Sequence, residues 1–331
     1  MLRRWLTEHL AVEPILGHWR RLMLKRQAIV LTYHEVLSDA MNVEAWTVVR
    51  ESELRRQLEY LKREFRVVSL AEALGIMQES SDNGPPPAVV TFDDGYVGNR
   101  RCLLPLVEEL EVPVTVFVST GAVQTQERYS YNRIILALQK NGDAPRSVDL
   151  RRWGLKTYQF GPRMTGERRW TRINDLLDGL KSLAPAQRLG AVEDALRGMT
   201  DARWPGDLFR PLSVTELREM STSPWVTIGA HSHCHSILVQ LSEAQIQDSV
   251  EMSRRLLQEW TGQSVEYFAY PNGDYDQRVI NAVTAAGFRC GMTVVSRPWS
   301  PSDSPFAIPR IGIGRYDTFD VFRAKVSGLS L

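Results

Sequence analysis

The chain has few cysteines, and this excludes several classes of protein. Its 331 residues include only Cys102, Cys234 and Cys290, which lie far apart. An odd number of widely spaced cysteines forms neither a disulfide framework nor a paired-cysteine zinc site. The pattern fits a reducing compartment, and we therefore expect a cytoplasmic protein.

Long apolar runs and a charge imbalance are also missing. No stretch of eighteen apolar residues is present, so no membrane span is expected. Met1-Leu2-Arg3-Arg4 is not followed by an uninterrupted apolar segment, and we do not expect a secretory signal. The formal net charge of +1 gives no reason to expect a nucleic-acid partner.

Residues 1–27 are predicted to form an N-terminal amphipathic helical segment. Apolar residues recur at helical spacing on both sides of Pro14, and residues 1–26 hold six Arg or Lys against two Glu. A basic amphipathic helix can lie on an anionic membrane, which would place the protein peripherally on the inner membrane face. A helix packed on its own domain shows the same stripe, and we favour that interpretation.

Strand-like and helix-like segments alternate over residues 28–120 and again over 213–331. Repeated β–α units predict a parallel sheet covered by helices, and their number suits a barrel. The segments Ser69–Glu72 and Ser213–Glu216 are capping boxes, each of which would open a helix. Other periodic segments predict strands at 28–33, 67–68, 88–92, 114–118, 226–229, 267–270, 290–295 and 307–313, and helices at 51–65, 100–110, 242–260, 276–286 and 318–326.

Residues 121–212 interrupt this alternation and are too long for an ordinary loop. Helices are predicted at 134–138, 173–183 and 192–199, so we expect an inserted helical subdomain near the site. Its residues 146–172 hold eight Arg or Lys and two acids, with Trp153 and Trp170 among them. Such a segment could bind an anionic saccharide or a lipid pyrophosphate, or it could be a solvated helical face.

Two short motifs contain the residues of a candidate metal site. Thr91-Phe92-Asp93-Asp94-Gly95-Tyr96 follows one predicted strand, and His231-Ser232-His233-Cys234-His235 follows another. Two His and one carboxylate are a common catalytic zinc set, with a fourth position open for water. Asp94, His231 and His235 are the predicted ligands, and Asp93, the spare carboxylate, is the predicted general base.

These assignments have alternatives. His231 could pair with His233 in an extended segment, because side chains two apart share a strand face. We expect instead that His233 points away from the metal and that Cys234 is buried. Asp-Asp-Gly is also a common turn sequence. Zinc is the expected metal, although cobalt, nickel or iron could bind the same ligand types.

Together the two motifs resemble those of the polysaccharide deacetylases of the NodB-homology group, carbohydrate esterase family 4. That family's motifs are T-F-D-D-G and H-[S/T]-x-x-H, and both are present without a mismatch. The resemblance covers about residues 28–120 and 213–315. It implies an α/β fold, a distorted and incomplete (β/α) barrel, with the site at the C-terminal ends of the strands.

A third motif is similar but altered. Tyr270-Pro271-Asn272-Gly273 resembles the family's turn that contacts the substrate and supplies a backbone N–H to the oxyanion, but Asn272 stands where an aromatic residue is usual. The arginine that normally holds the base is absent from this region. Arg310 could take over as the partner of the base.

The general acid that the resemblance implies is absent from its usual place near the C-terminus. No histidine follows His235, so the family's C-terminal acid is missing. His34, which follows Tyr33, resembles the Tyr-His element of the poly-N-acetylglucosamine deacetylases. Because the first and last strands of a closed barrel are neighbours, His34 could occupy the place of the missing acid.

The resemblance implies an enzyme that uses one divalent metal to remove acetyl groups from an N-acetylated amino sugar. The glycan could be a polysaccharide, an oligosaccharide or a lipid-linked intermediate. A catalytically inactive carbohydrate-binding barrel is the alternative, since an aromatic residue and an arginine of the pattern are missing. A glycosidase would need two carboxylates roughly 5–10 Å apart across the substrate, which adjacent aspartates do not supply.

Overall fold

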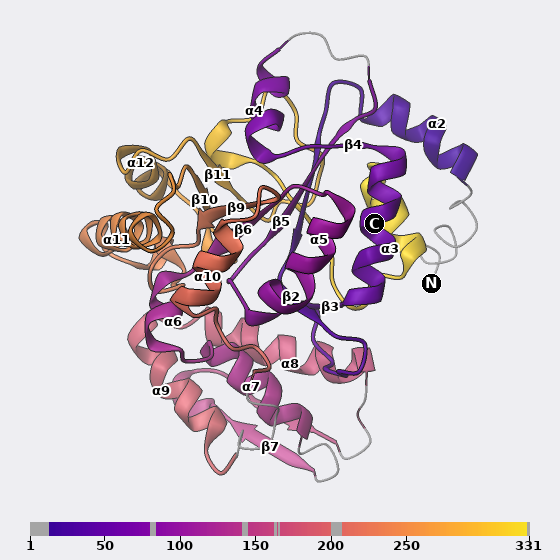
Figure 1. Cartoon of the computed structure of the whole chain (residues 1–331). Helices are drawn as coiled ribbons and strands as arrows, with labels where there is room; N and C mark the ends of the chain where they lie inside the picture. The colour runs from indigo at the N-terminus through magenta and orange to yellow at the C-terminus, as the bar shows by residue number, and fades with distance from the viewer. Residues whose placement is uncertain are drawn as a thin grey trace.

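A curled sheet of parallel strands forms the centre of the molecule (Figure 1). The structure, a computed structural model, describes residues 13–79, 84–140, 145–161, 164, 166–199 and 207–329. The strands run in the spatial order β11-β10-β9-β6-β5-β1-β12, and β4 pairs with β5. Their bounds are β1 Ile29–Tyr33, β4 Arg66–Val67, β5 Pro87–Phe92, β6 Val114–Val118, β9 Val226–Ala230, β10 Tyr267–Ala269, β11 Cys290–Met292 and β12 Ile311–Gly312.

The sheet is an incomplete (β/α) barrel, which confirms the predicted fold class. Strands β1, β5 and β6 are buried at every position, as expected for parallel strands covered on both faces. Strand β1 pairs with both β5 and β12, so the first and last strands are neighbours.

The barrel has a seam between β11 and β12. Ile308 bridges Met292 of β11, whereas Ile311 pairs with Leu31 of β1. Because the chain changes partner between these positions, the strand predicted at 307–313 is reduced to Ile311–Gly312. The strand predicted at 290–295 likewise ends early, at Met292. Arg310 lies in the seam and is fully buried.

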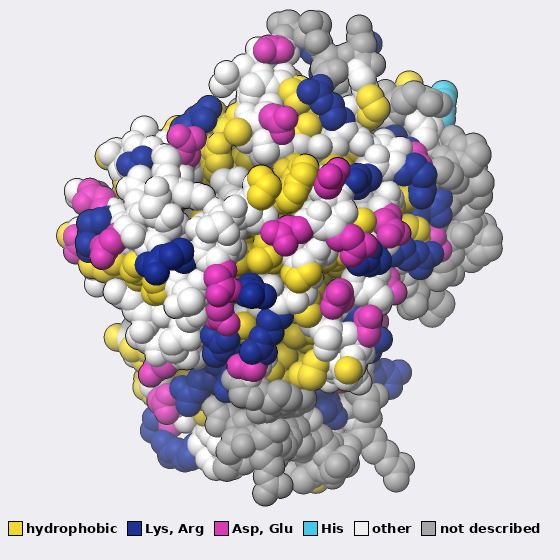
Figure 2. Space-filling view, in the orientation of Figure 1, with side chains coloured by type: hydrophobic (Ala, Val, Ile, Leu, Met, Phe, Trp, Pro, Cys, Tyr) yellow, Lys and Arg dark blue, Asp and Glu magenta, His cyan; other side chains and the backbone are white. Residues whose placement is uncertain are grey.

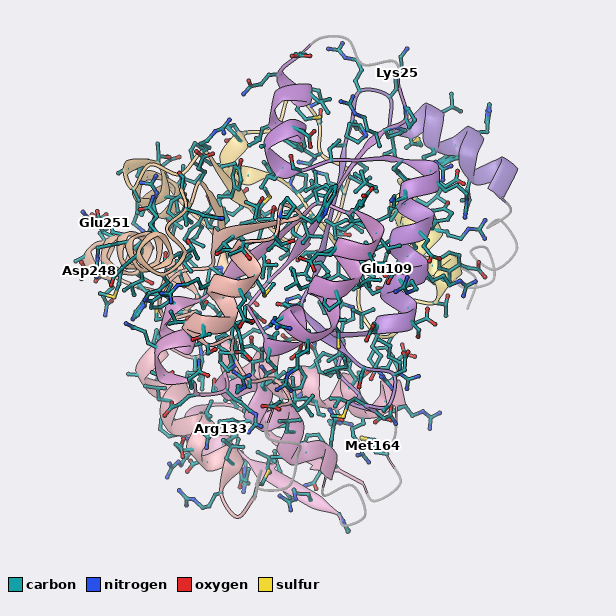
Figure 3. All side chains as sticks on the ribbon, viewed as in Figure 1. Lys25, Glu109, Arg133, Met164, Asp248 and Glu251 are labelled. Carbon is teal, nitrogen blue, oxygen red and sulfur yellow. The ribbon has the colours of Figure 1, made fainter. Side chains whose placement is uncertain are left out.

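Helices surround the sheet (Figure 1). Both predicted capping boxes are present, at Ser69 and at Ser213, and a third caps α11 at Ser242. In Figure 3 Asp248 and Glu251 lie on the outer side of α11, while Ile246 of the same helix is buried. The helices are α3 Glu51–Glu64, α4 Leu70–Gln78, α5 Leu104–Leu110, α6 Thr120–Thr125, α10 Val214–Ser221, α11 Glu243–Thr261, α12 Gln277–Ala285 and α13 Phe319–Val326, with a π-turn, η1 Asn99–Leu103, before α5 and short 3-10 turns at η3 Leu238–Gln240 and η5 Pro305–Ala307.

The insertion lies at one end of the molecule, opposite α4 (Figure 1). It contains the three predicted helices as α7 Ser130–Lys140, α8 Gly166–Lys181 and α9 Pro185–Leu196. The predicted helical insertion also contains a hairpin that was not predicted, in which β7 Arg146–Asp149 and β8 Thr157–Phe160 pair antiparallel around the turn η2 Arg151–Trp153. The domain boundaries themselves stay a prediction.

The insertion shares an apolar core with a loop of the barrel. Two short strands that were not predicted, β2 Glu35–Leu37 and β3 Val48–Arg50, pair in parallel and flank this loop. Leu37 and Val43 pack in the same cluster as Ile134 and Leu176 of the insertion. The insertion is therefore anchored to the segment that follows β1.

The N-terminal helix α2 (Glu13–Met23) begins with Pro14 in its first turn, and the rest of the predicted amphipathic segment, residues 1–12, lies outside the described residues. Arg20 packs inward and donates to the Tyr60 hydroxyl, while Trp19, Leu22 and Met23 are exposed. None of the described helices has the length and apolar character needed to cross a membrane. Peripheral membrane contact stays a prediction.

Candidate metal centre

The predicted site residues lie where neighbouring strands end. Tyr33 pairs with Phe92, so His34 and Asp93 follow at one level. Across β6, the last residue of β9 is Ala230, and His231 comes directly after it. Since parallel strands end at the same edge of a sheet, the register brings these residues together.

Asp94, His231 and His235 form a compact cluster. Their potential ligand atoms all lie within 4.8 Å of one another. The Oδ1 atom of Asp94 is 2.9 Å from Nε2 of His235 and 3.4 Å from Nε2 of His231. Two imidazole nitrogens and a carboxylate oxygen suit a divalent metal, and among the described residues this is the set that could hold one.

The protein fixes the orientation of these ligands. His231 donates from Nδ1 to the Ala269 carbonyl at 2.7 Å, which leaves its Nε2 free as a ligand. Burial raises the pKa of Asp94, but His235 and His231 outweigh it and hold that pKa well below its usual range. The residues therefore fit a cation, because the carboxylate is ionised and both imidazoles point at it.

The loop after β9 is a tight turn rather than a helix. Ser232 and His235 have φ values of 62° and 51°. His233 points elsewhere, as predicted: its Nδ1 lies 2.9 Å from the Thr120 hydroxyl. The prediction that Cys234 is buried is wrong, because its side chain is exposed where the turn bulges outward, with Sγ 3.4 Å from the Ser249 hydroxyl.

Asp93 is held by Arg310. The guanidinium donates to both carboxylate oxygens at 2.7 Å, and its Nε donates to the Thr293 carbonyl at 2.9 Å. Burial raises the pKa of Asp93, but Arg310 and His231 lower it by more, so the carboxylate is ionised. The pairing expected between Asp93 and Arg310 is therefore present.

His34 lies beside the same centre. Burial lowers the pKa of its imidazole most, while the Asp94 and Asp93 carboxylates raise it in part, and the net pKa is below the usual value. Its Nδ1 is buried without a hydrogen-bond partner, and Trp46 meets the ring edge-on at 5.7 Å between centroids. An imidazole in this setting can exchange a proton with a reacting group.

The turn after β10 contains the predicted substrate-contact residues, and they differ in how far they are buried. Pro271–Gly273 is a 3-10 turn in which Asn272 has a φ of 60°, and it starts two residues after Ala269, the partner of His231. The Tyr270 side chain is fully buried and its hydroxyl donates to the Phe306 carbonyl at 2.9 Å. Within the turn Asn272 is exposed, Gly273 is partly exposed and Pro271 is buried, and contact of these residues and Tyr270 with a substrate stays a prediction.

A set of polar aromatic side chains that was not predicted also lies at the site. Tyr131 donates to Oδ2 of Asp94 at 2.9 Å, and Tyr129 donates to the Asp94 backbone carbonyl at 2.8 Å. Tyr96 and Asn132 continue this network. The sequence Tyr129-Ser130-Tyr131-Asn132, soon after β6, was the available signal.

Several basic side chains of residues 146–172 have acidic partners in the described part of the insertion. Arg151 pairs with Asp149, and Lys156 pairs with Asp175. Figure 2 shows Lys and Arg interspersed with Asp and Glu on the visible face. These pairs favour a solvated, ion-paired surface over an anion-binding segment.

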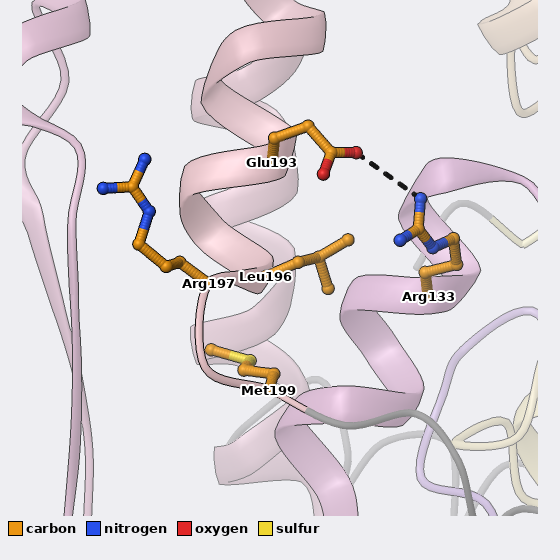
Figure 4. Close-up of a pocket in the computed structure, with 5 residues that line it drawn as sticks. All are labelled: Arg133, Glu193, Leu196, Arg197 and Met199. Atoms are coloured by element: carbon orange, nitrogen blue, oxygen red, sulfur yellow. Dashed lines mark ion pairs between the residues drawn. The ribbon is translucent and has the colours of Figure 1, made fainter.

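A pocket in the insertion, between α7 and α9, contains none of the predicted site residues (Figure 4). The Arg133 guanidinium lies 3.6 Å from the Glu193 carboxylate. The pocket's other arginine, Arg197, pairs with Asp194 at 2.5 Å. Both arginines that line the pocket therefore have acidic partners, which argues against an anion-binding site in this pocket. Its lining residues are Arg133, Glu193, Leu196, Arg197 and Met199.

Several solved structures share this fold. The Streptococcus pyogenes deacetylase PplD, in complex with acetate, is 14% identical with a TM-score of 0.59, and the match covers 91% of this chain and 98% of that one. IcaB from Ammonifex degensii is 18% identical with a TM-score of 0.58, over 91% and 97% of the two chains. A de-N-acetylase from Aggregatibacter actinomycetemcomitans is 13% identical with a TM-score of 0.57, over 90% and 99%.

Sequence comparison gives the family. No curated protein matches the chain significantly. The sequence profile of the polysaccharide deacetylase family, however, matches residues 80–148 and 195–291, which together are about half of the chain and include Asp93, Asp94, His231 and His235. The chain therefore belongs to the polysaccharide deacetylase family.

Proposed function

We propose that the protein is a metal-dependent hydrolase that removes acetyl groups from the N-acetylated amino sugars of a glycan. One observation carries the proposal: an ionised carboxylate, Asp93, stands beside a separate cluster of metal-ligand type, Asp94, His231 and His235. A ligand set with a spare carboxylate suits hydrolysis of an amide better than it suits binding alone. The related deacetylases share the fold.

Asp94, His231 and His235 would hold the metal, and zinc is the ion we propose. When bound, a divalent ion would act as a Lewis acid on the acetyl carbonyl and would make water more acidic. The identity of the ion is a proposal that rests on ligand type, because two imidazoles and one carboxylate also suit other transition metals.

Asp93 would accept the proton of the attacking water. Arg310 keeps that carboxylate ionised and holds both of its oxygens, which limits its rotation. Water would add to the acetyl carbon, and the backbone N–H of Asn272 would face the developing oxyanion. His34 would protonate the leaving nitrogen as the C–N bond breaks, which gives acetate and a free amino sugar.

The glycan and its location stay part of the proposal. The Tyr-His element, whose residues are Tyr33 and His34, favours a poly-N-acetylglucosamine type of substrate by resemblance. A cytoplasmic location would favour a short oligosaccharide or a lipid-linked intermediate.

Acetate release from a graded series of N-acetylglucosamine oligosaccharides tests the function, with zinc added to the metal-free protein. Wild-type protein should release acetate, and Asp93→Asn should keep its metal and lose turnover. Asp248→Asn, on the outer side of α11, is the matched control and should behave as wild type. Loss of metal and turnover together in Asp93→Asn would reject the division of roles. A metal-loaded wild-type protein that binds these glycans without releasing acetate would instead indicate an inactive binding barrel.

A further inference from the structure

Two tyrosines connect the insertion to the metal cluster. Tyr129 precedes α7 and Tyr131 lies in its first turn. Their rings stack 5.3 Å apart, and they lie against the His235 ring at 4.7 Å and 5.6 Å between centroids. Their hydroxyls both donate to Asp94. One short segment thus contacts the side chain and backbone of one predicted ligand and the ring of another.

The two carboxylate oxygens of Asp94 have different partners. Oδ1 faces the Nε2 atoms of His231 and His235, at 3.4 Å and 2.9 Å. Oδ2 accepts the Tyr131 hydroxyl at 2.9 Å. With Oδ2 already occupied, Oδ1 is the oxygen that remains directed toward the imidazoles.

The direction of the Tyr131 hydroxyl is set by its neighbours. Asn132 donates from Nδ2 to the Tyr96 oxygen at 2.7 Å, and the Tyr96 and Tyr131 oxygens are 2.9 Å apart. An ionised carboxylate can only accept, so Tyr131 must donate to Asp94 and Tyr96 must donate to Tyr131. Since Tyr96 and Asn132 are fully buried, water does not compete for these bonds.

The backbone at Asp94 also depends on the insertion. Asp94 has a φ of 75° and Gly95 a φ of 71°, and a left-handed conformation is unfavourable for a residue other than glycine. Tyr129 binds the Asp94 carbonyl, and at the other end of the insertion Leu212 donates its backbone N–H to the Gly95 carbonyl at 2.8 Å. Both ends of the insertion therefore hold the turn that presents the Asp94 carboxylate.

We propose that Tyr131, supported by Tyr129, is a positioning residue of the metal centre. By holding Oδ2 of Asp94, its hydroxyl would leave only Oδ1 available to a bound metal, and a coordination position would then stay open for the reaction. This inference rests on the proposed function, because it presupposes metal at the cluster. It also gives the insertion a role in the reaction, since the insertion supplies the second partner of a ligand carboxylate.

Metal affinity of Tyr131→Phe tests this proposal, measured by zinc competition with a chromogenic chelator. The ring and its stacking remain, so only the hydrogen bond is lost. Loss of such a bond to a ligating carboxylate typically weakens metal binding by about 10–100-fold. Tyr158→Phe is the control, because Tyr158 is buried in the same insertion on β8 and is not part of the cluster.

A spectrum of the cobalt-substituted protein distinguishes positioning from general loosening. Freed from Tyr131, Oδ2 can join Oδ1 on the metal, which raises the coordination number. The visible absorption of Tyr131→Phe should therefore be weaker than that of wild type, while Tyr158→Phe keeps the wild-type spectrum.

The outcomes separate this inference from the proposed function. Wild-type protein that binds no metal would reject both. Wild type that binds metal, with a Tyr131→Phe variant equal to Tyr158→Phe in affinity and spectrum, would overturn the positioning role alone. If Tyr131→Phe also lowers the melting temperature of the metal-free protein, Tyr96→Phe decides: it leaves Tyr131 in place, should weaken metal binding by a smaller factor, and an unchanged affinity would overturn the proposal.

Discussion

Arg310 and Asp93 form a bidentate ion pair inside the barrel, although 217 positions separate them in the chain. Both contacts are 2.7 Å, and the side chains are 0% and 4% exposed. Arg310 comes from the seam segment that passes from β11 to β1, and Asp93 follows β5, so the pair connects the seam to the end of β5. The Arg310 side chain therefore has two roles: it lies at the seam of the barrel, and it keeps the carboxylate of the proposed base ionised.

Arg310→Met should be strongly destabilising. It leaves the Asp93 carboxylate buried without its partner, which typically costs about 3–5 kcal/mol. Urea denaturation measures the free energy of unfolding. The control is Arg297→Met, which breaks an ion pair with Asp303 in which Arg297 is 45% exposed, and such a pair contributes about 0–1 kcal/mol. Equal stability of the two variants would contradict the buried pairing.

His34→Gln should reduce turnover on amide substrates while metal content stays at the wild-type level. A general acid contributes about 10²–10⁴-fold in rate. An activated aryl acetate has a leaving group that needs no proton, so its hydrolysis should change far less. Comparison of the two substrates measures the effect, with His233→Gln as the control. A similar loss on both substrates would argue that His34 only shapes the site.

Asn272→Gly should retain turnover within a few-fold of wild type. The proposed oxyanion donor is the backbone N–H, and glycine adopts the φ of 60° found at this position without strain. The Asn272 side chain donates to Asp274 at 2.6 Å, so it is engaged within its own turn. Steady-state kinetics provide the check, and a large fall in kcat would show that the side chain itself takes part.

Glu216 should make stability depend on pH in the acid range. Burial raises its pKa, but Arg210 and the Ser213 donors outweigh this and lower the pKa from 4.5 to about 2. Because the folded-state pKa is depressed, the contribution to stability is full above pH 4.5 and is lost as the pH falls toward about 2.

Glu216→Gln should therefore show a shallower loss of stability than wild type over this pH range. Thermal unfolding between pH 2 and 5.5 measures it, given the pKa of about 2. Glu251→Gln, on the outer side of α11, is the control. Parallel curves for wild type and Glu216→Gln would refute the linkage.

The elements with strong local signals could be predicted from the sequence. Buried runs such as Val114–Val118 match β6 in their bounds, and the capping boxes at Ser69 and Ser213 are formed as expected. The cluster of Asp94, His231 and His235 could also be predicted, because each residue directly follows a strand-like run or lies in a short turn after one.

Features that depend on contacts between distant segments could not be predicted in full. The sequence around Ile308 predicts one strand over residues 307–313. The observed strand is shorter because the chain changes its pairing partner at the seam. Cys234 was predicted to be buried, but the left-handed backbone at Ser232 and His235 leaves its side chain exposed to solvent. The hydrogen bond from Tyr131 to Asp94 joins the insertion to the barrel, and the polar aromatic sequence around Tyr131 does not by itself indicate this partner.

The most direct test is the metal content of the purified protein by mass spectrometry, run beside His231→Ala and His233→Ala. Both variants remove an imidazole from the same loop, but only His231 belongs to the cluster with Asp94 and His235. We predict about one equivalent of transition metal in wild type and in His233→Ala, and its loss in His231→Ala. Absence of metal from wild-type protein even after zinc is added back, or full retention in His231→Ala, would contradict the proposed centre.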